Sequence, residues 1–459
     1  MPEETAARIE DPGIRTLFSR ESRWQVWLDV EAALARAQAD LGVIPASAAD
    51  EIVIKAKLEL LDQDAIRDGL DRTGHALVPV IWELDRVCEG DAGGFVHWGA
   101  TTQNITQTGQ LLLLRRAHNV FLSLLGDLLV ILADLAETTK DMLLPGRTHG
   151  QHAVPATFGL KVSVWIDEFC RHAERLRQCE DRVFVTMLGG AAGTLASLGE
   201  EGFATQAKMA EALNMVAMRN PARTLYDHQA EYVALLGLLG ATSGKVGREI
   251  YTLMKQEFGE VEEPVPPGTV GSSTMPQKRN PKLAQDIIAG AAELRSLVPL
   301  ALEAVQAEHE ADRTSSLMMG RAITESCIIT GDVLARMNSM LGGLKVFPTR
   351  MRENLDLSGG LIMAEALMLD LGKKIGRQNA HDVIYEAAQA SVTEQRAFRD
   401  LLLEDKRVTD QLTREEMEVL MDPARYVGLS SRFAELGATR AREVAAALRA
   451  ASPHGEKST

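Results

Sequence analysis

Five long stretches of helix-forming sequence constrain this chain more than any other feature. Their apolar residues recur at helical spacing, and neither strand-rich segments nor helix–strand alternation separates them. The stretches cover residues 110–142, 156–185, 228–258, 282–309 and 319–341. A helix of about 30 residues is about 45 Å long, so five of them form an elongated bundle. The sequence therefore predicts an all-α protein and argues against a Rossmann fold or a barrel.

Shorter segments flank the long stretches and divide the chain into three parts. Turns up to Gly99 predict an N-terminal helical domain over residues 1–109, and shorter helices after Pro348 predict a C-terminal helical domain over residues 351–459. The central bundle then spans residues 110–350. Parts of the first long stretch are too apolar for a single buried stripe, which predicts that bundles pack against one another in an oligomer.

Charge and cysteine usage limit the partners and the compartment. The net charge is −15, and an acidic surface repels phosphate backbones and anionic lipid, so neither nucleic acid nor membrane is an expected partner. We expect no apolar run that approaches the roughly 18 to 20 residues of a membrane span, and the acidic N-terminus lacks the apolar core of a signal peptide. The four cysteines show no framework spacing, which favours a reducing cytoplasm. An anionic substrate would need local positive charge in the site.

The segment 265–281, between two long stretches, is the most informative part of the sequence. Connections between bundle helices need about two to eight residues, and this one is longer and rich in glycine, serine and proline. Gly271 lets the backbone bring Ser272 close to a ligand. Lys278 supplies positive charge and Asn280 a hydrogen-bond donor. These groups predict a pocket for an anion, which can also stabilise the charge that forms when a proton is removed next to a carboxylate.

The same loop resembles the signature of the fumarase/aspartase superfamily, G-S-S-x-x-P-x-K-x-N, and matches it at every fixed position. The resemblance implies that Ser272 is the base of the reaction. A serine hydroxyl is a weak base in water, so this role needs a positive environment from which solvent is excluded. We expect four residues within this signature to bind substrate, namely Ser273, Met275, Lys278 and Asn280. Lys278 and Asn280 are expected to bind it through a carboxylate.

A second polar patch precedes the first long stretch and consists of Thr101, Thr102, Gln103 and Asn104. Hydroxyl and amide groups at a helix N-terminus form a good carboxylate site, because the free N–H groups and the helix dipole add to them. Simple capping is the alternative, but it needs fewer polar residues. A similar segment binds substrate carboxylate in the superfamily, where many members have Asp in place of Asn104 and of Gln107.

Two histidine patches complete the candidate site. The segment around His149 is similar to one whose histidine is proposed, in adenylosuccinate and argininosuccinate lyases, to act in protonating the leaving nitrogen. His149 and His152 form an H-x-x-H pattern, but no third ligand is suitably spaced, so no metal is expected. His75 resembles another active-site histidine of the adenylosuccinate lyases, and a structural histidine at a helix start is the alternative. Arg313 lies in a segment similar to a nucleotide-binding segment of those lyases, and we expect it to contact substrate.

These patches lie at the ends of different long helices, so one bundle could hardly bring them all together. The resemblance, which extends from Arg15 to Tyr426, implies a solution to this problem. It implies a homotetramer whose core is built from the long-helix bundles and whose active sites are each shared among three chains. It also implies a small carboxylate substrate and no cofactor.

Within the superfamily, the sequence is most similar to the branch of adenylosuccinate lyase and 3-carboxy-cis,cis-muconate cycloisomerase. Residues 359–367 look like the cycloisomerases, whereas His75 and His149 together are typical of the carbon–nitrogen lyases. We give the histidines more weight and predict reversible β-elimination of an amine from an N-substituted aspartate, with release of fumarate. The alternative reaction is lactonisation of 3-carboxy-cis,cis-muconate. A structural protein without turnover, like the crystallins of this superfamily, is the alternative of another class.

Overall fold

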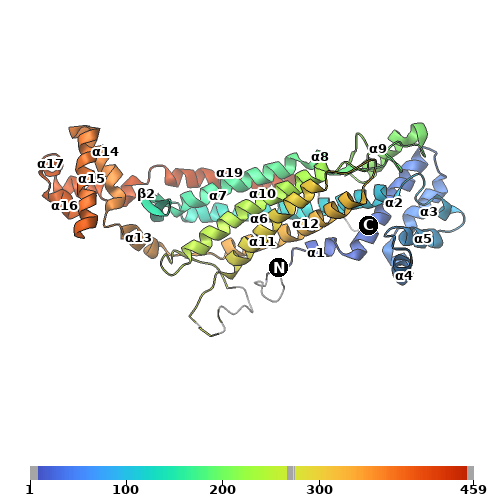
Figure 1. The fold of residues 1–459 in the computed structure, drawn as a ribbon, viewed down its shortest axis with the longest axis horizontal. Coiled ribbons are helices and arrows are strands. Elements are labelled where there is room, and N and C mark those ends of the chain that lie inside the picture. Colours follow the sequence, from blue (N-terminus) through green and yellow to red (C-terminus); the bar gives the residue numbers. More distant parts are fainter. Residues whose placement is uncertain (1–8, 266–271, 273, 276, 452–459) are drawn as a thin grey trace.

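The computed structural model describes residues 9–265, 272, 274, 275 and 277–451 of the protein, which form an elongated bundle of long helices with a helical cluster at each end (Figure 1). The long helices are α6 (Thr102–Thr138), α7 (Phe158–Gln178), α10 (Asp227–Leu253), α11 (Lys282–Glu303) and α12 (Arg313–Gly342). A sixth, α19 (Ser430–Ala451), runs back along the bundle and packs against α6 and α7. The predicted all-α fold with a central long-helix bundle is confirmed.

The shorter helices form the two end clusters. The N-terminal cluster contains α2 (Arg20–Asp40), α3 (Ala46–Lys55), α4 (Gln63–Thr73) and α5 (Val78–Val87), with α9 (Gly202–Ala212) beside α2. The short helix α1 (Ile14–Leu17) lies against α6 and α12 of the bundle (Figure 1). The C-terminal cluster has a separate apolar core and contains α13 (Pro348–Asp356), α14 (Ala364–Ile375), α15 (Arg377–Glu394), α16 (Phe398–Glu404), α17 (Lys406–Thr409) and α18 (Arg414–Leu420). Because α6 begins at Thr102, the predicted domain boundary between residues 109 and 110 falls inside this helix.

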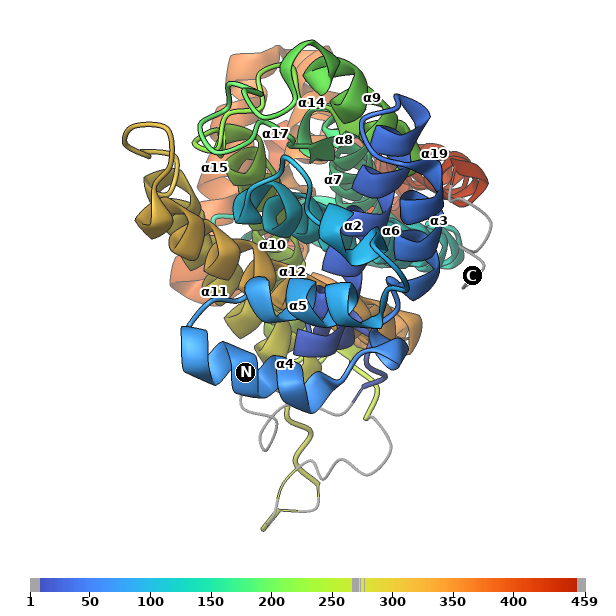
Figure 2. The same cartoon turned by 90° about the vertical axis from the view of Figure 1, so that its right-hand side faces the viewer.

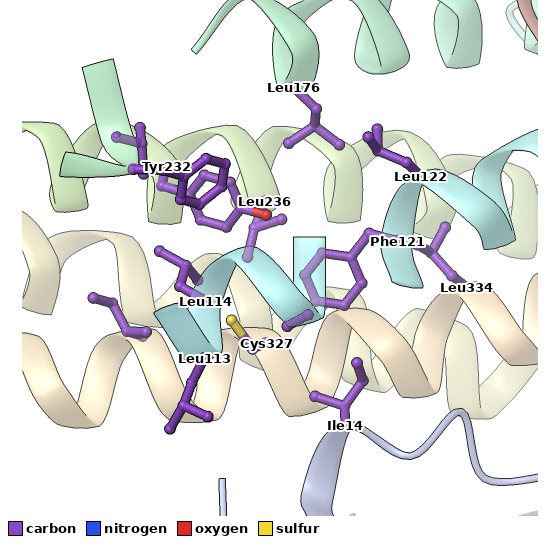
Figure 3. Packing of buried hydrophobic residues seen from close by; sticks show 14 of the residues in the cluster. Ile14, Leu113, Leu114, Phe121, Leu122, Leu176, Tyr232, Leu236, Cys327 and Leu334 are labelled. Carbon is purple, nitrogen blue, oxygen red and sulfur yellow. The ribbon is translucent and has the colours of Figure 1, made fainter. Parts of the chain in front are cut away.

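Helix α6 is the central element of the main core. Leu113, Leu114 and Phe121 on this helix are buried, and Figure 3 shows them among side chains of the neighbouring long helices. Within the described residues, α6 is the one helix that is long and apolar enough to cross a membrane by length and composition, so the expectation that no apolar run approaches a membrane span was wrong. The helix packs against α2, α7, α12 and α19, which explains its apolar composition as that of a core helix.

Glycines on one face of α10 allow α11 to approach closely. A Cβ atom at Gly237 would lie 2.5 Å from a methyl carbon of Val298, and one at Gly240 would lie 2.8 Å from a methyl carbon of Leu294. Such distances are too short for real contacts, so only glycine fits at these positions without rearrangement. The two helices that flank the loop 254–281 are therefore packed tightly against each other.

Short strands occur in places where no strand was predicted from the sequence. β1 (Leu143–Thr148) and β2 (Gln151–Thr157) form an antiparallel hairpin between α6 and α7. Pro145 and Pro155 lie opposite each other in this hairpin, and proline lacks the N–H that a helix interior requires. The remaining strands form two further pairs, β3 (Val185–Thr186) with β4 (Val216–Ala217) and β5 (Val261–Glu262) with β6 (Lys345–Val346).

Candidate active site

A cavity of about 890 Å³ lies at the end of the bundle where α6, α10 and α12 begin. Figure 2 shows the molecule from this end, with α4 and α5 in front. The residues of the predicted site that line this cavity are His75, Thr101, Thr102, Gln103 and Arg313. They come from three segments that are far apart in the sequence. The fold therefore brings together groups that only the family resemblance had connected.

A capping box fixes the first turn of α6. The amide of Thr101 donates to Oδ1 of Asn104 at 3.0 Å, and the same oxygen accepts from the amide of Gly190 at 3.1 Å. Asn104 is fully buried and does not line the cavity, so its side chain holds the glycine-rich turn against the helix. Thr101 and Thr102 lie in the cavity wall, where the N-terminus of α6 favours an anion.

His75 is both a helix-start residue and a cavity residue. Its Nδ1 accepts a hydrogen bond from the amide of Val78, in the first turn of α5, at 3.2 Å. A ring nitrogen that accepts carries no proton, so in the neutral imidazole the proton is on Nε2. That nitrogen lies 3.4 Å from the hydroxyl of Thr102. The structural and the functional interpretation of His75 are therefore compatible.

Gln103 links α6 to the segment that precedes α10. Its Oε1 accepts from Nε of Arg223 at 3.0 Å, and its Nε2 lies 2.7 Å from the carbonyl oxygen of the same arginine. The Nε2 group is also 2.8 Å from the hydroxyl of Tyr226 and 2.9 Å from Oε1 of Gln107. Burial raises the pKa of Tyr226, so this phenol is neutral at physiological pH. Gln103 thus organises one wall of the cavity.

The cavity has more positive than negative side chains. Its arginines are Arg23, Arg223, Arg313 and Arg321. In the part of the chain that the structure describes, none of the four forms an ion pair. The carboxylates of the lining are Asp312 and Glu325, and Asp312 caps α12 by accepting from the amide of Thr314 at 2.8 Å, a hydrogen bond that lowers its pKa. The cavity can therefore attract an anion although the chain has a net charge of −15.

His149 lies at the other end of the bundle, at the tip of the β1–β2 hairpin (Figure 1). His149 and Gly150 form the two-residue turn with φ angles of 52° and 76°, as in a type I′ turn, and the histidine is exposed. Helix α6 lies between the cavity and the hairpin, and its 37 residues give it a length of about 55 Å. His149 therefore cannot reach the cavity of its own chain.

Ser272 also lies away from the cavity. Helix α10 begins at the cavity, and the loop that contains Ser272 follows the opposite end of this helix. Its Oγ accepts from the amide of Met275 at 3.1 Å, and the carbonyl of Met275 accepts from the amide of Lys278 at 3.0 Å. Met275 and Lys278 are exposed and Asn280 is half-buried, and none of these residues lines the cavity. Ser273 lies outside the described residues.

One segment, 260–263, holds the hairpin and the end of the loop within a single chain. Glu260 is fully buried and pairs with Arg147 of β1, with Nη1 and Oε2 3.1 Å apart. Glu263 accepts from two amides in the first turn of α11, at 2.8 and 2.9 Å. Burial raises the pKa of Glu263 to about 7. These two carboxylates had not been identified from the sequence.

The histidines of the hairpin are not part of a metal site in the structure as described. No group of three or more His, Cys, Asp or Glu side chains is placed to hold a metal among residues 9–265, 272, 274, 275 and 277–451. His152 is half-buried, and its burial together with the charge of Arg147 lowers its pKa. A neutral imidazole next to Arg147 fits a structural role for His152 in the hairpin.

The sequence did not reveal most of the charged groups of the cavity. Arg23, Arg223 and Tyr226 match no motif, and Arg321 follows the expected Arg313 by two turns of α12. Arg223 and Tyr226 directly precede α10. The available signal was a polar residue at a helix start, but only the packing shows which helix starts meet.

Comparisons with known proteins agree with this architecture. A family model described as lyase matches residues 7–294, and one described as adenylosuccinate lyase C-terminus matches residues 360–435. The chain is 39% identical over 432 residues to adenylosuccinate lyase of Methanothermobacter thermautotrophicus, covering 93% of this chain and 96% of that protein. It is also 39% identical to N-acetyl-S-(2-succino)cysteine lyase of Enterococcus italicus, covering 91% of each chain.

A solved structure shows the same fold. The 3-carboxy-cis,cis-muconate lactonizing enzyme of Pseudomonas putida superposes with a TM-score of 0.88 at 34% identity, covering 94% of this chain and 97% of that one. The chain therefore belongs to the fumarase/aspartase superfamily of lyases, in the branch of adenylosuccinate lyase and 3-carboxy-cis,cis-muconate cycloisomerase.

Proposed function

We propose that this protein catalyses the reversible β-elimination of an amine from an N-substituted aspartate, with release of fumarate. The observation that carries the proposal is the cavity itself. It combines the Thr101–Thr102 helix start and His75 with four arginines that form no ion pair within the described residues. A dianionic succinyl group is a suitable ligand for such a cavity.

In the proposed reaction, Ser272 and His149 move the protons. Ser272 removes a proton from the carbon next to one substrate carboxylate, and cationic groups such as Lys278 stabilise the negative charge that develops on that carboxylate. The electron pair then forms the double bond of fumarate as the carbon–nitrogen bond breaks. His149 gives its proton to the departing nitrogen, which leaves as the neutral amine. No cofactor enters this scheme.

The proposed reaction needs more than one chain. His149 is about one helix length, or about 55 Å, from the cavity of its own chain. We therefore propose a homotetramer in which three chains contribute to each site, with the cavity, the hairpin and the Ser272 loop each from a different chain. A cytoplasmic location, without nucleic acid or membrane as a partner, remains our proposal as well.

Lactonisation of 3-carboxy-cis,cis-muconate is the second candidate. The structural similarity to a lactonizing enzyme and the sequence of residues 359–367 favour it. The pair of histidines favours the elimination reaction, because a leaving nitrogen needs a proton donor.

The test uses purified protein mixed with fumarate and a panel of amines. Thiols are included because one relative is named as a lyase of a succinated cysteine. Loss of fumarate absorbance that disappears in Ser272→Ala would support the elimination and would begin to identify the leaving group. Lactone formation from 3-carboxy-cis,cis-muconate without any fumarate chemistry would replace it with the second candidate. No turnover of any substrate would favour a structural protein.

A further inference from the structure

Arg223 differs from an ordinary ion-paired arginine because neutral groups alone fix its orientation. Its Nε donates to Oε1 of Gln103 at 3.0 Å, and its Nη1 donates to the carbonyl oxygen of Ala191 at 2.7 Å. Among the described residues, no carboxylate forms an ion pair with it and Nη2 makes no hydrogen bond. A guanidinium remains charged at any physiological pH, so an oriented and unneutralised positive charge lines the cavity.

Gln103 holds this arginine at two points. The side-chain oxygen accepts from the guanidinium, and the side-chain nitrogen lies 2.7 Å from the carbonyl oxygen of Arg223. A glutamate at position 103 could make the first contact equally well, but it would neutralise the arginine. The neutral amide orients the guanidinium and leaves its charge for a ligand. Such preorganisation lowers the entropic cost of binding.

Asp312, the carboxylate of the cavity lining at the start of α12, does not neutralise the charge of Arg223. Asp312 directs Oδ1 to the amide of Thr314 at 2.8 Å and Oδ2 to the hydroxyl of Ser315 at 3.4 Å. Its negative charge is thus used to cap the helix. Glu325, the other carboxylate of the lining, forms no ion pair with Arg223 either.

The succinyl part of the proposed substrate is expected to bind to other groups. The carboxylate-binding groups expected for it are Thr101, Thr102, Gln103 and Asn104 of one patch and Lys278 and Asn280 of the other, and Arg223 belongs to neither patch. Arg223 lies in the cavity wall on the segment that precedes α10. The part of the substrate that remains for Arg223 is the leaving group.

We infer, on the basis of the proposed function, that Arg223 is a specificity-determining residue that binds an anionic group on the leaving part of the substrate. The substrate class is then a succinyl adduct with a negative charge beyond its two succinyl carboxylates. The planar guanidinium can offer two parallel N–H groups to a carboxylate or a phosphate. Gln103 acts in this binding as a positioning residue.

The experiment measures binding of inert substrate analogues to the assembled, full-length protein by calorimetry. The probes are succinates that carry a carboxyalkyl group with one, two or three methylene groups in place of the leaving group. Each is compared with the alkyl succinate of the same length that lacks the terminal carboxylate. A second arm replaces the terminal carboxylate by a phosphonate, which distinguishes a carboxylate from a phosphate ligand. The variants are Arg223→Gln, Gln103→Glu and, as a matched control at an exposed position on the same segment, Arg219→Gln.

In the unmodified protein, the best acidic probe should bind about tenfold more tightly than its alkyl counterpart, as expected for one charge-assisted contact. Arg223→Gln and Gln103→Glu should both remove this difference, which is the ratio of the affinities for the acidic and the alkyl probe in the same variant. Arg219→Gln should retain the difference. Gln103→Glu also keeps the inference testable if Arg223→Gln does not fold.

Two results would count against the inference in different ways. Equal affinity for acidic and alkyl probes in the unmodified protein, or an undiminished preference in both Arg223→Gln and Gln103→Glu, would overturn it while the succinyl site stands. Failure of every succinate probe to bind would contradict the proposed function and the inference together.

Discussion

The two ends of the bundle are built in different ways. At the cavity end, three long helices begin together, and Arg223 is held in place by the neutral acceptors of Gln103 and Ala191. At the hairpin end, His149 occupies an exposed turn with a φ angle of 52°, and the hydroxyl of Ser272 accepts from the amide of Met275. The first end is suited to binding an anion, and the second holds the groups that we propose to transfer protons.

This difference indicates how the chemistry is distributed over the chain. A non-glycine residue with positive φ is strained, and such strain is often found where function sets the conformation. The buried carboxylates Glu260 and Glu263 hold the hairpin and the end of the loop on one segment, so the hairpin end is also a defined unit. In the proposed mechanism, binding and proton transfer are thus kept apart in one chain and would be combined by assembly.

The largest effect should come from removing the proposed base at the hairpin end. Ser272→Ala should lower kcat by about 10²- to 10⁴-fold, the usual contribution of a group that transfers a proton. Binding of succinate probes should be largely unchanged, since the proposed role of the Ser272 hydroxyl is to remove a proton, whereas the carboxylate contacts are assigned to other residues. Fumarate absorbance and calorimetry measure the two properties separately. A variant that retains full kcat would remove Ser272 from the mechanism.

His149→Asn should separate activity from stability at the same end. Activity should fall by about 10²- to 10⁴-fold because the proposed acid is lost. The free energy of unfolding should stay the same or rise by up to about 1 kcal/mol, since asparagine tolerates the positive φ of the turn better than histidine does. Turnover and thermal denaturation test the two parts. A marked loss of stability would show that His149 has a structural role.

Glu260→Gln tests what holds the hairpin in place. This change leaves Arg147 without the buried negative charge that opposes its own charge, and it should lower the free energy of unfolding by about 3–5 kcal/mol. The matched control is Glu262→Gln, two residues away, whose carboxylate pairs with the exposed Lys345 at 3.2 Å. The control substitution should lower the free energy of unfolding by about 1 kcal/mol or less. Equal losses in chemical denaturation would contradict the account of the hairpin.

The smallest effect concerns the pH dependence of stability. The pKa of Glu263 is raised to about 7 by burial, whereas an unfolded glutamate has a pKa of about 4.3. Its stabilising contribution is therefore fully present below about pH 4.3 and is lost as the pH rises through about 7. Between pH 6 and 8, the free energy of unfolding of the unmodified protein should fall by about 1 kcal/mol more than that of Glu263→Gln. Denaturation curves that shift in parallel at both pH values would contradict the raised pKa.

The fold was largely predictable because its signal is local. Helical periodicity over 30 residues specifies a long helix whatever it packs against, and it predicted all five long helices. The end positions were less accurate, and α6 runs from Thr102 to Thr138 instead of residues 110–142. The β1–β2 hairpin was not predicted from the sequence, and prolines such as Pro145 and Pro155 are uncommon inside strands.

The site was predictable only where it follows a motif. The sequence indicated Thr101, Thr102 and Gln103, but it could not show that the neighbouring Asn104 turns inward to bind the amide of Gly190. Arg223 could not be identified from the sequence, because its place in the cavity depends on three helix starts that meet in space. Its neutral partner, Gln103, is 120 residues away in the sequence. The motif roles of Ser272 and His149 remain predictions.

The most direct test of the shared site is complementation between inactive chains. Thr102→Val removes a cavity contact, and Ser272→Ala removes the proposed base. Each variant alone should have little activity, and co-expressed hybrids should regain about one quarter of the unmodified activity, because half of the chains supply each intact residue. Hybrid oligomers that form but are no more active than either parent would contradict an active site built from more than one chain.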